Sequence, residues 1–246
     1  MQKIIVIGAN SAIASQCLRR WLVQPAEVLL VGRNQESLQR LAQDLAVRSP
    51  DSRIQVATLD FQSPADIDEL IASCVEEQPI DLALVAHGSL PAQEDCQQDL
   101  SCAQQALALN GVSPALFAES LSGAMERAGG GTLVLIGSVA GDRGRKSNYV
   151  YGAAKGMLER YAQGLQHRLA GGAVKVCLVK PGPTRTPMTA HLVDSGLPLA
   201  DVAEVADTIV KGVEKGKPVI YAPGKWALIM LVIRHLPRMV FNSLDI

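Results

Sequence analysis

Apolar, strand-like runs alternate with helical stretches along most of this 246-residue chain. The apolar runs cover residues 3–7, 27–31, 53–59, 82–86, 132–136, 174–179 and 219–221. Between them, sequences with helical periodicity cover residues 12–22, 35–47, 65–76, 97–128, 148–169 and 199–215. This order is typical of strand–helix–strand units, in which each helix returns the chain to the start of the next parallel strand.

Several of these runs are apolar at successive positions rather than at alternate ones. Strands of this kind are buried on both faces, as in a parallel sheet that helices cover on each side. The sequence shows no internal repeat beyond the alternation, no low-complexity tract and no linker. We therefore predict an α/β fold with a doubly wound, parallel, seven-stranded sheet of the Rossmann type, formed by a single domain over residues 1–246.

The first predicted strand leads into a turn of small residues, which reads Gly8-Ala9-Asn10-Ser11-Ala12-Ile13-Ala14. Small side chains let the backbone approach a pyrophosphate, and a helix N-terminus offers unpaired N–H groups and positive potential. The turn is therefore a candidate dinucleotide site. Ala12 and Ala14 stand where such turns usually carry a second and third glycine. Taken alone, the turn is equally compatible with an ordinary strand-to-helix connection.

Tyr151 and Lys155 are four residues apart, and Ser138 lies thirteen residues before Tyr151 at the end of an apolar run. Residues four apart share one face of a helix, so the phenol and the ammonium can point into one cleft. A nearby cation lowers the pKa of a phenol, and a serine hydroxyl can hold a substrate oxygen. The set suits proton transfer to or from an alcohol or carbonyl oxygen. The pair alone is also compatible with an ordinary amphipathic helix.

With these motifs in order, the chain resembles the short-chain dehydrogenase/reductase family over nearly its whole length. The glycine turn, the Pro-Gly segment that begins at Pro181 and the active-site set Asn110, Ser138, Tyr151 and Lys155 match at typical spacings. One departure follows the fourth strand, where the family usually has Asn-Asn-Ala-Gly and this chain has Ala86-His87-Gly88-Ser89. That departure removes the usual side-chain support of the cofactor strand, whereas backbone contacts at Ala86 and Gly88 are still expected.

The resemblance implies a role for each matched residue. Tyr151 would be the general acid of reduction or the base of oxidation, and Lys155 would lower its pKa and bind the nicotinamide ribose. Ser138 would position the substrate oxygen, and Asn110 would hold a water that links Lys155 to solvent. The residues expected to contact the dinucleotide are Gly8, Asn10, Ser11, Ala12, Ile13, Arg33, Asp60, Phe61, Ala86, Gly88, Tyr151, Lys155, Pro181, Gly182, Thr184 and Thr186, with Asp60 and Phe61 beside the adenine.

The choice between NADP and NAD depends on the end of the second strand, Leu30-Val31-Gly32-Arg33-Asn34. An acidic residue there would accept hydrogen bonds from the ribose 2′-OH of NAD. None is present, and Arg33 offers a fork of donors suited to a 2′-phosphate. We therefore expect NADPH to be preferred. The alternative is a surface arginine that covers the adenine and accepts either cofactor.

Composition and residue spacing limit the partners, the cell compartment and the metal sites that can be expected. Lys and Arg total 23 against 24 for Asp and Glu, which gives no reason to expect a nucleic acid partner. The five cysteines form no CxxC pair, and the strand-like start leaves no room for a secretion signal, so we expect reduced thiols in a cytoplasmic protein. Neither His87 nor His191 belongs to a metal-ligand cluster. No metal site is predicted.

Two further segments bear on the substrate. Residues 141–146, between Ser138 and Tyr151, carry three basic residues and one acid, and they either bind an anionic substrate or form a solvated loop. Residues 224–246 form a tail whose apolar stretch, 226–233, is too short to span a bilayer. From residue 208 onward there are six basic and two acidic residues. The tail could meet anionic lipid or a lipid-tailed substrate, or pack on the core or in a subunit interface.

Three segments also resemble a narrower group, the decaprenylphosphoryl-keto-pentose reductases: residues 138–155, residues 181–191 and the tail around residues 233–238. That resemblance implies reduction of the 2-keto sugar of a polyprenyl-phosphate pentose, with a flavin oxidase as partner. The apolar, basic tail separately leaves open peripheral contact of a cytoplasmic protein with the inner face of a membrane. A general reductase of small ketones is the alternative within the family. A dinucleotide-binding protein without turnover is the alternative outside the enzymes. The family also implies a homodimer or homotetramer formed through the helices of Asn110 and Tyr151.

Overall fold

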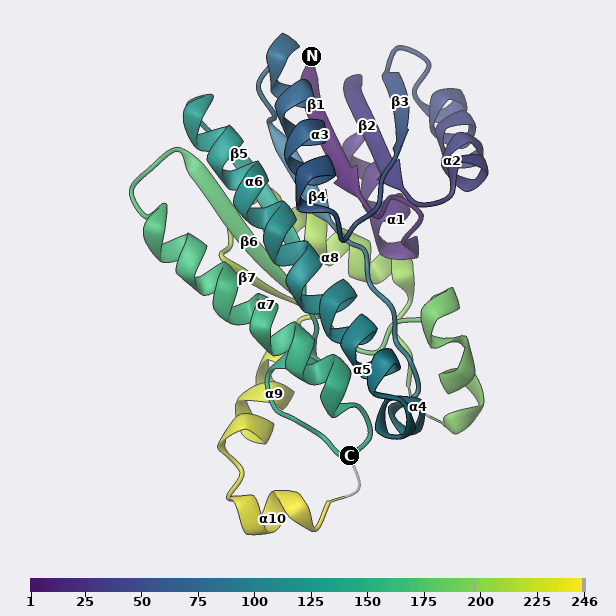
Figure 1. Ribbon diagram of the computed structural model, residues 1–246, viewed down its shortest axis with the longest axis vertical. Coiled ribbons are helices and arrows are strands. Elements are labelled where there is room, and N and C mark those ends of the chain that lie inside the picture. Colours follow the sequence, from purple (N-terminus) through teal and green to yellow (C-terminus); the bar gives the residue numbers. More distant parts are fainter. Residues whose placement is uncertain (197, 245–246) are drawn as a thin grey trace.

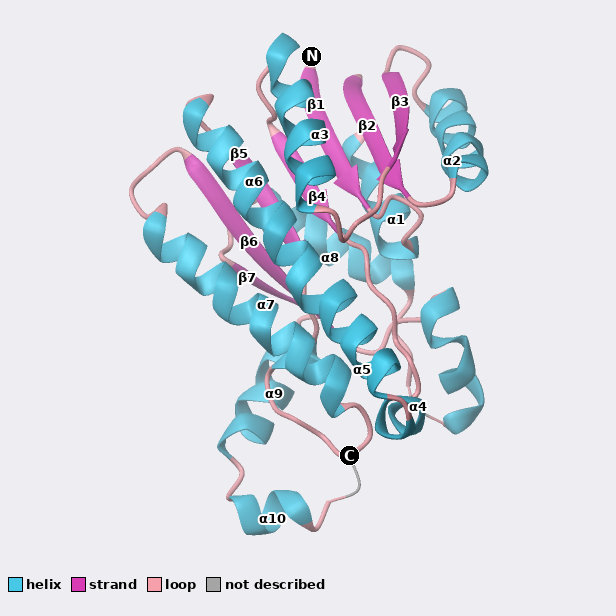
Figure 2. Cartoon of the chain, viewed as in Figure 1, coloured by secondary structure: helices cyan, strands magenta, loops and turns pink. Residues whose placement is uncertain are grey.

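The computed structural model of the chain describes residues 1–196 and 198–244, and its centre is a parallel β-sheet (Figures 1 and 2). The seven strands found in the described residues pair in the order β3-β2-β1-β4-β5-β6-β7. Their bounds are β1 (Gln2–Ile7), β2 (Ala26–Gly32), β3 (Arg53–Thr58), β4 (Leu82–Val85), β5 (Gly131–Ile136), β6 (Val174–Pro181) and β7 (Val219–Ala222). The predicted doubly wound sheet is confirmed, and all seven predicted strands are present.

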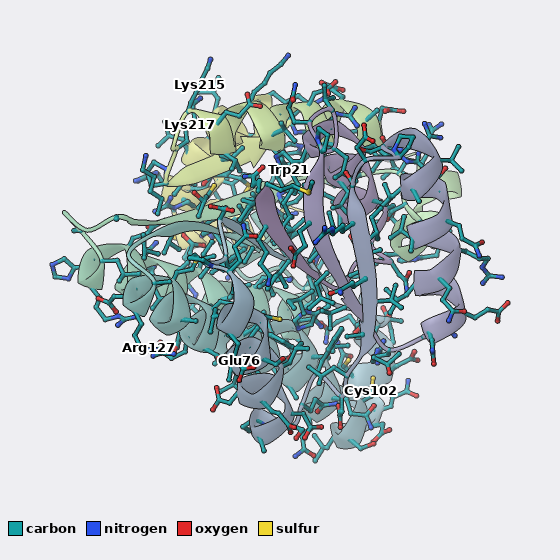
Figure 3. The ribbon with its side chains drawn as sticks, turned by 90° about the horizontal axis from the view of Figure 1, so that it is seen from above. Trp21, Glu76, Cys102, Arg127, Lys215 and Lys217 are labelled. Carbon is teal, nitrogen blue, oxygen red and sulfur yellow. The ribbon has the colours of Figure 1, made fainter. Side chains whose placement is uncertain are left out.

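Helices cover both faces of this sheet. One face carries α1 (Ala12–Trp21), α2 (Gln35–Arg48) and α8 (Val202–Glu214), and the other carries α3 (Pro64–Glu77), α6 (Ser113–Arg127) and α7 (Tyr149–Arg168). Figure 3, seen from above Figure 1, shows the two layers: Lys215 and Lys217 follow α8 on one side of the sheet, and Glu76 and Arg127 lie on the other. The chain therefore folds as three layers.

The strand sequences explain why two separate cores form. Successive residues of a strand point to opposite faces, and in β1 both kinds are apolar. Ile4 and Val6 belong to the core under α1, α2 and α8, whereas Ile5 and Ile7 belong to the core under α3, α6 and α7. All four are fully buried. Runs that are apolar at every position thus produce a sheet that is dry on both sides.

The predicted single helix over residues 97–128 is wrong. The structure has α4 (Gln93–Gln98), α5 (Leu100–Leu107), the π-helical turn η1 (Ala108–Val112) and then α6. Asp99 is extended and caps α5 by accepting a hydrogen bond from the Ser101 backbone N–H, at 2.8 Å. The helix is interrupted there, because the backbone of Asp99, with φ −127° and ψ 109°, is extended rather than helical. The remaining elements are η2 (Val139–Gly141), η3 (Pro187–Ser195), α9 (Lys225–His235) and α10 (Arg238–Asn242).

The predicted C-terminal tail folds into α9 and α10, which project from the lower end of the molecule in Figure 1. Met230 is the buried residue of α9, whereas Leu228, Leu231 and Val232 are each more than half exposed. Trp226 packs so closely on the Gly182 backbone that a side chain at Gly182 would collide with the indole. The tail is therefore anchored at its start and exposes an apolar surface beyond it. Within the part of the chain that is described, no helix has the length and apolar character needed to cross a bilayer.

The strand order reverses between β1 and β4, which places their carboxyl ends on either side of a crevice. Ligands of doubly wound sheets bind at such a switch point. The turn after β1, the loop after β4 and the end of β5 all meet there.

Candidate functional site

A cavity of about 760 Å³ lies at the carboxyl ends of the strands. Every predicted site residue except Asp60 lines it, including Asn110, Ser138, Tyr151 and Lys155. Segments from β1 to η3 contribute to its walls, so residues that are distant in sequence share one space. Asp60 instead lies at the surface, where its carboxylate accepts a hydrogen bond from the Gln62 backbone at 3.0 Å.

The turn after β1 requires glycine at residue 8. Gly8 has a φ of +78°, and a Cβ there would lie 2.5 Å from the His87 backbone nitrogen. Only glycine avoids both the strained dihedral and the collision. The Ser11 side chain caps α1 by accepting a hydrogen bond from the Ala14 N–H, and the first turn of α1 has no acidic residue. A helix N-terminus that faces the cavity in this way favours an anion.

His87, which departs from the family pattern, is a buried wall of the cavity. Its ring nitrogen Nε2 lies 2.8 Å from the Ser113 hydroxyl, and its ring centroid is 4.6 Å from that of Phe61. Burial, together with the charges of Lys155 and Arg33, lowers the pKa of His87 to about 3. The histidine is therefore neutral at physiological pH and supports the loop after β4 by packing. Sequence reasoning assigned it no role.

Asn110 lies in η1 and is fully buried. Its side-chain oxygen accepts a hydrogen bond from the Ser89 backbone at 2.9 Å, and its amide donates to the Ala106 carbonyl at 2.8 Å. The side chain thus fixes the loop after β4 against the helix. Single π-helical turns are frequent at functional sites because they re-aim one residue. The predicted water-holding role of Asn110 remains a prediction.

Ser138, Tyr151 and Lys155 converge on the same region of the cavity. Ser138 lies two residues after the end of β5, where it caps η2, and Tyr151 and Lys155 lie one turn apart on α7. The Lys155 ammonium donates to the Ile136 carbonyl at 2.9 Å and lies 5.9 Å from the centroid of the Tyr151 ring. A hydroxyl, a phenol and an ammonium therefore face one space, as the sequence spacing predicted.

The pKa of Tyr151 does not move in the predicted direction. Desolvation raises it above its ordinary value, and a hydrogen bond with Ser138 opposes that rise without cancelling it. Desolvation also lowers the pKa of Lys155 to about 8. The ammonium is bound to the Ile136 carbonyl, and it is not among the groups that shift the phenol. In this structure the phenol is therefore protonated at neutral pH, which suits a proton donor.

A buried ion cluster holds three segments of the site together. Lys180, at the end of β6, binds Asp142 and also Glu159, at 2.8 Å to the latter, and the Tyr221 hydroxyl donates to Asp142 at 3.0 Å. Burial acts to lower the pKa of Lys180, but its bonds to Asp142 and Glu159 outweigh that effect and raise it. Glu159 lies one turn after Lys155, and Lys180 directly precedes Pro181. The cluster thus fixes α7 relative to the loop after β6.

The basic loop 141–146 is engaged with the tail. The Arg143 guanidinium donates to the carbonyls of Ile233 and Leu236, at 2.6 and 2.8 Å, and lies 3.8 Å from the centroid of the Phe241 ring. Arg145 contacts the Met230 sulfur at 3.5 Å and also lines the cavity. Arg143 therefore has a structural contact, whereas Arg145 faces the site.

Arg33 lies exposed at the cavity edge, and its side chain makes no hydrogen bond or ion pair with the residues that the structure describes. Thr184 is buried and donates to the Gly182 carbonyl at 2.8 Å, and Thr186 caps η3. Both threonines line the cavity. In residues 1–196 and 198–244, no group of three His, Cys, Asp or Glu side chains could hold a metal.

A second hollow, of about 740 Å³, lies over α3 and α6. It is lined by charged side chains that bind one another, such as Arg168 with Glu126 at 3.0 Å. It brings together no set suited to proton transfer, so it does not compete with the cavity at the strand ends.

Comparisons with known proteins agree with this geometry. The family model described as short chain dehydrogenase matches residues 2–195. An uncharacterized oxidoreductase of Mycobacterium tuberculosis is 33% identical over 98% of this chain and 96% of its own length. One of Streptomyces coelicolor is 29% identical, over 99% and 96%.

Solved structures show the same fold. A short chain dehydrogenase from Burkholderia cenocepacia in complex with NADP has a TM-score of 0.83 and 20% identity, and the match covers all of both chains. A short-chain dehydrogenase from Sphingobium yanoikuyae in complex with NADPH has a TM-score of 0.80 and 22% identity over 97% of each chain. The sequence match over most of the chain, together with the shared fold, shows that this chain belongs to the short-chain dehydrogenase/reductase family of oxidoreductases.

Proposed function

We propose that this chain reduces a ketone with NADPH, and that Tyr151 donates the proton. The observation that carries the proposal is the convergence of Ser138, Tyr151 and Lys155 in one cavity beside the turn after β1. Such a set is unnecessary in a protein that only binds a dinucleotide. The neutral phenol, whose pKa desolvation raises, fits the direction of reduction.

The residues around the cavity fit a dinucleotide. Gly8 and the start of α1 would hold the pyrophosphate, and Phe61 and Arg33 would flank the adenosine. Thr184 and Thr186 would contact the nicotinamide end. Asp60 is a weaker candidate for the adenine, because it does not line the cavity. The bound nicotinamide would supply the hydride.

Side chains of the protein would position the substrate and transfer the proton. Ser138 would hold the carbonyl oxygen of the substrate by a hydrogen bond. As the carbonyl carbon gains hydride, the Tyr151 hydroxyl would give its proton to that oxygen, which yields the alcohol and leaves a phenolate. Lys155 would stabilise this anion by its charge, and a solvent proton would restore the phenol.

Preference for NADPH over NADH rests on Arg33, whose side chain is unpaired among the described residues and whose strand end has no acid. The two solved structures named above are complexes with NADP and with NADPH. NADPH oxidation should be followed with a panel of ketones, and then repeated with NADH. Turnover with NADPH is expected. No turnover with any ketone, despite tight binding of NADPH, would favour the non-catalytic alternative.

For the substrate, we propose the 2-keto sugar of a polyprenyl-phosphate pentose. The support is the exposed apolar surface of α9 and α10 close to the site, since Trp226 contacts Gly182 in the cavity wall. Deleting the residues after Gly224 should reduce activity on the lipid-linked ketose far more than on a small ketone. Equal losses would favour the second candidate, a general reductase of small ketones.

The same surface supports peripheral contact with a membrane by an otherwise cytoplasmic protein. Leu228, Leu231 and Met239 are exposed, with Arg234 and Arg238 beside them. Apolar side chains flanked by cations favour an anionic lipid surface. Sedimentation with vesicles that contain phosphatidylglycerol should pull down the full chain but not the truncated one.

A homodimer or homotetramer is proposed through the helices that follow Asn110 and carry Tyr151. Val112 and Met157 are each more than 40% exposed on these elements. Light scattering should give a mass of two or four chains, and Met157→Glu should lower that mass.

A further inference from the structure

The cavity contains buried polar atoms that have no partner. Among the described residues, the buried side-chain nitrogen or oxygen atoms without a hydrogen bond are His87 Nδ1, Gln93 Nε2, Arg145 Nε and Asn148 Oδ1. All four residues line the cavity that contains Tyr151. Leaving one such atom unpaired costs about 1–3 kcal/mol, so these atoms are rare in folded proteins. Their collection in one cavity indicates groups arranged for a ligand.

Three of these residues lie together at the end of α7 that carries Tyr151. The Gln93 side-chain oxygen accepts a hydrogen bond from the Val150 backbone at 3.1 Å, which leaves its amide NH₂ unpaired. The Asn148 backbone donates to the Arg145 carbonyl at 3.2 Å. Gln93 is only 4% exposed, and Asn148 directly precedes α7. Gln93 and Asn148 were not predicted as site residues, whereas Arg145 belongs to the loop 141–146, for which the sequence left anion binding open.

The charge of Arg145 is not neutralised by a neighbouring acid. Asp142 is near enough to influence its pKa, but the two Asp142 oxygens already bind Lys180 and the Tyr221 hydroxyl. The contact of Arg145 with the Met230 sulfur involves Nη2, and a thioether is a weak acceptor. Glu94 also lines the cavity, but it is exposed to solvent. A half-buried guanidinium therefore faces the site.

We infer that Gln93, Arg145 and Asn148 form a subsite that selects ketones carrying both an anionic group and a hydroxyl. Arg145 and Gln93 would donate to the oxygens of a phosphate or carboxylate, and the Asn148 oxygen would accept from the hydroxyl. The subsite rests on the proposed function, because it orients the ketone toward Tyr151. A site built to pair with polar groups rejects substrates that lack them.

Four ketones test the inference: 2-pentanone, 4-oxopentanoate, ribulose and ribulose 5-phosphate. The variants are Arg145→Gln and Gln93→Glu, and the latter keeps the acceptor for Val150 while it removes the donor. Because a hydrogen bond to a charged group contributes about 1.5–3 kcal/mol, kcat/KM for ribulose 5-phosphate should fall about tenfold or more in each variant. For 2-pentanone it should stay within about twofold. Arg40→Gln, on the surface of α2, is the matched control for loss of one positive charge.

The two anionic ketones separate phosphate from carboxylate selectivity. Equal losses on all four ketones, or unchanged kinetics with ribulose 5-phosphate, would overturn the subsite. Calorimetry of ribulose 5-phosphate with the NADP-saturated protein gives a readout that does not depend on turnover. Weaker binding to Arg145→Gln without turnover of any ketone would support the subsite and contradict the proposed reaction. If 2-pentanone is turned over but the native chain and Arg145→Gln bind ribulose 5-phosphate equally well, the proposed reaction would be supported and the subsite contradicted.

Discussion

The two ends of the cavity are built in different ways. At the cofactor end, backbone turns form the walls, and side chains such as Asn110 and Thr184 are bound to neighbouring backbone groups. At the substrate end, Gln93, Arg145 and Asn148 keep three of the four unpaired buried polar atoms found in the described residues, and the fourth, on His87, lies beside Gly8. A fixed backbone can hold a ligand whose shape does not vary, such as a dinucleotide. Selection among ketones needs side-chain groups that are not already paired within the protein. From this comparison we propose that the dinucleotide would be held mainly by backbone, with Arg33 as an added side-chain contact, and that the ketone would be selected by side chains.

The largest expected effect is the loss of kcat on replacing Tyr151. Replacing Tyr151 by Phe removes the proton donor, and general acid catalysis contributes about 10²–10⁴-fold, so kcat should fall by about a thousandfold. The dissociation constant for NADPH should change less than about twofold, because the ring remains. Stopped-flow and fluorescence titration measure the two quantities. A variant that retains most of its turnover would remove Tyr151 from the chemistry.

The backbone character of the cofactor end can be tested at Gly8. Gly8→Ala combines a positive φ with a collision against the His87 backbone, so the free energy of unfolding should fall by about 3 kcal/mol and NADPH binding should weaken. Gly129→Ala is the matched control, because Gly129 has a φ of +91° and nothing within 4 Å of the added carbon. Its cost should be about 1 kcal/mol. Equal costs at the two positions would show that the contact with His87 is not tight.

His87 should make the fold sensitive to acid. Its pKa is about 3 in the folded chain against an ordinary 6.5, so the unfolded chain binds the extra proton between these values. The free energy that neutral His87 contributes to the folded state is fully present above pH 6.5 and is lost as the pH falls toward 3. Between pH 7 and pH 4 the native chain should lose about 3 kcal/mol more than His87→Gln. Urea unfolding at both pH values measures the difference, and parallel losses would show that His87 is accessible to protons.

The smallest expected effect is on cofactor choice. Arg33→Ala should weaken NADPH binding by about tenfold, which is the size of one charge-assisted hydrogen bond, and leave NADH binding unchanged. Arg40→Ala, on the surface of α2, provides a charge-matched control, because Arg40 binds Glu36 and does not line the cavity. Parallel weakening for both cofactors would assign Arg33 to the adenine rather than to a 2′-phosphate.

The fold could be predicted because its signals are local. Strands such as β1 and β5 are apolar at successive positions, and the helices between them carry their own caps, such as Ser11. The break at Asp99 was missed because the apolar periodicity continues across it. The candidate set of Ser138, Tyr151 and Lys155 could be proposed from the sequence because Tyr151 and Lys155 are one helical turn apart, and the structure places all three in one cavity.

The substrate end could not be predicted in the same way. Gln93 and Arg145 are 52 residues apart, and only the tertiary fold brings them to one cavity. The roles of Arg143 and Arg145 look alike in the sequence, yet the carbonyls of Ile233 and Leu236 bind one and not the other. The direction of the Tyr151 pKa also depends on burial, which the spacing of residues does not reveal.

The central claim is that a ketone receives hydride at carbon and a proton from Tyr151 at oxygen. The most direct measurement is mass spectrometry of the alcohol formed from a ketone with NADPH deuterated at C4 of the nicotinamide. The native chain should place one deuterium on the carbinol carbon, and Tyr151→Phe should bind the same NADPH but form almost no alcohol. Alcohol without deuterium from either C4 position, or full deuterium transfer by the phenylalanine variant, would contradict the claim.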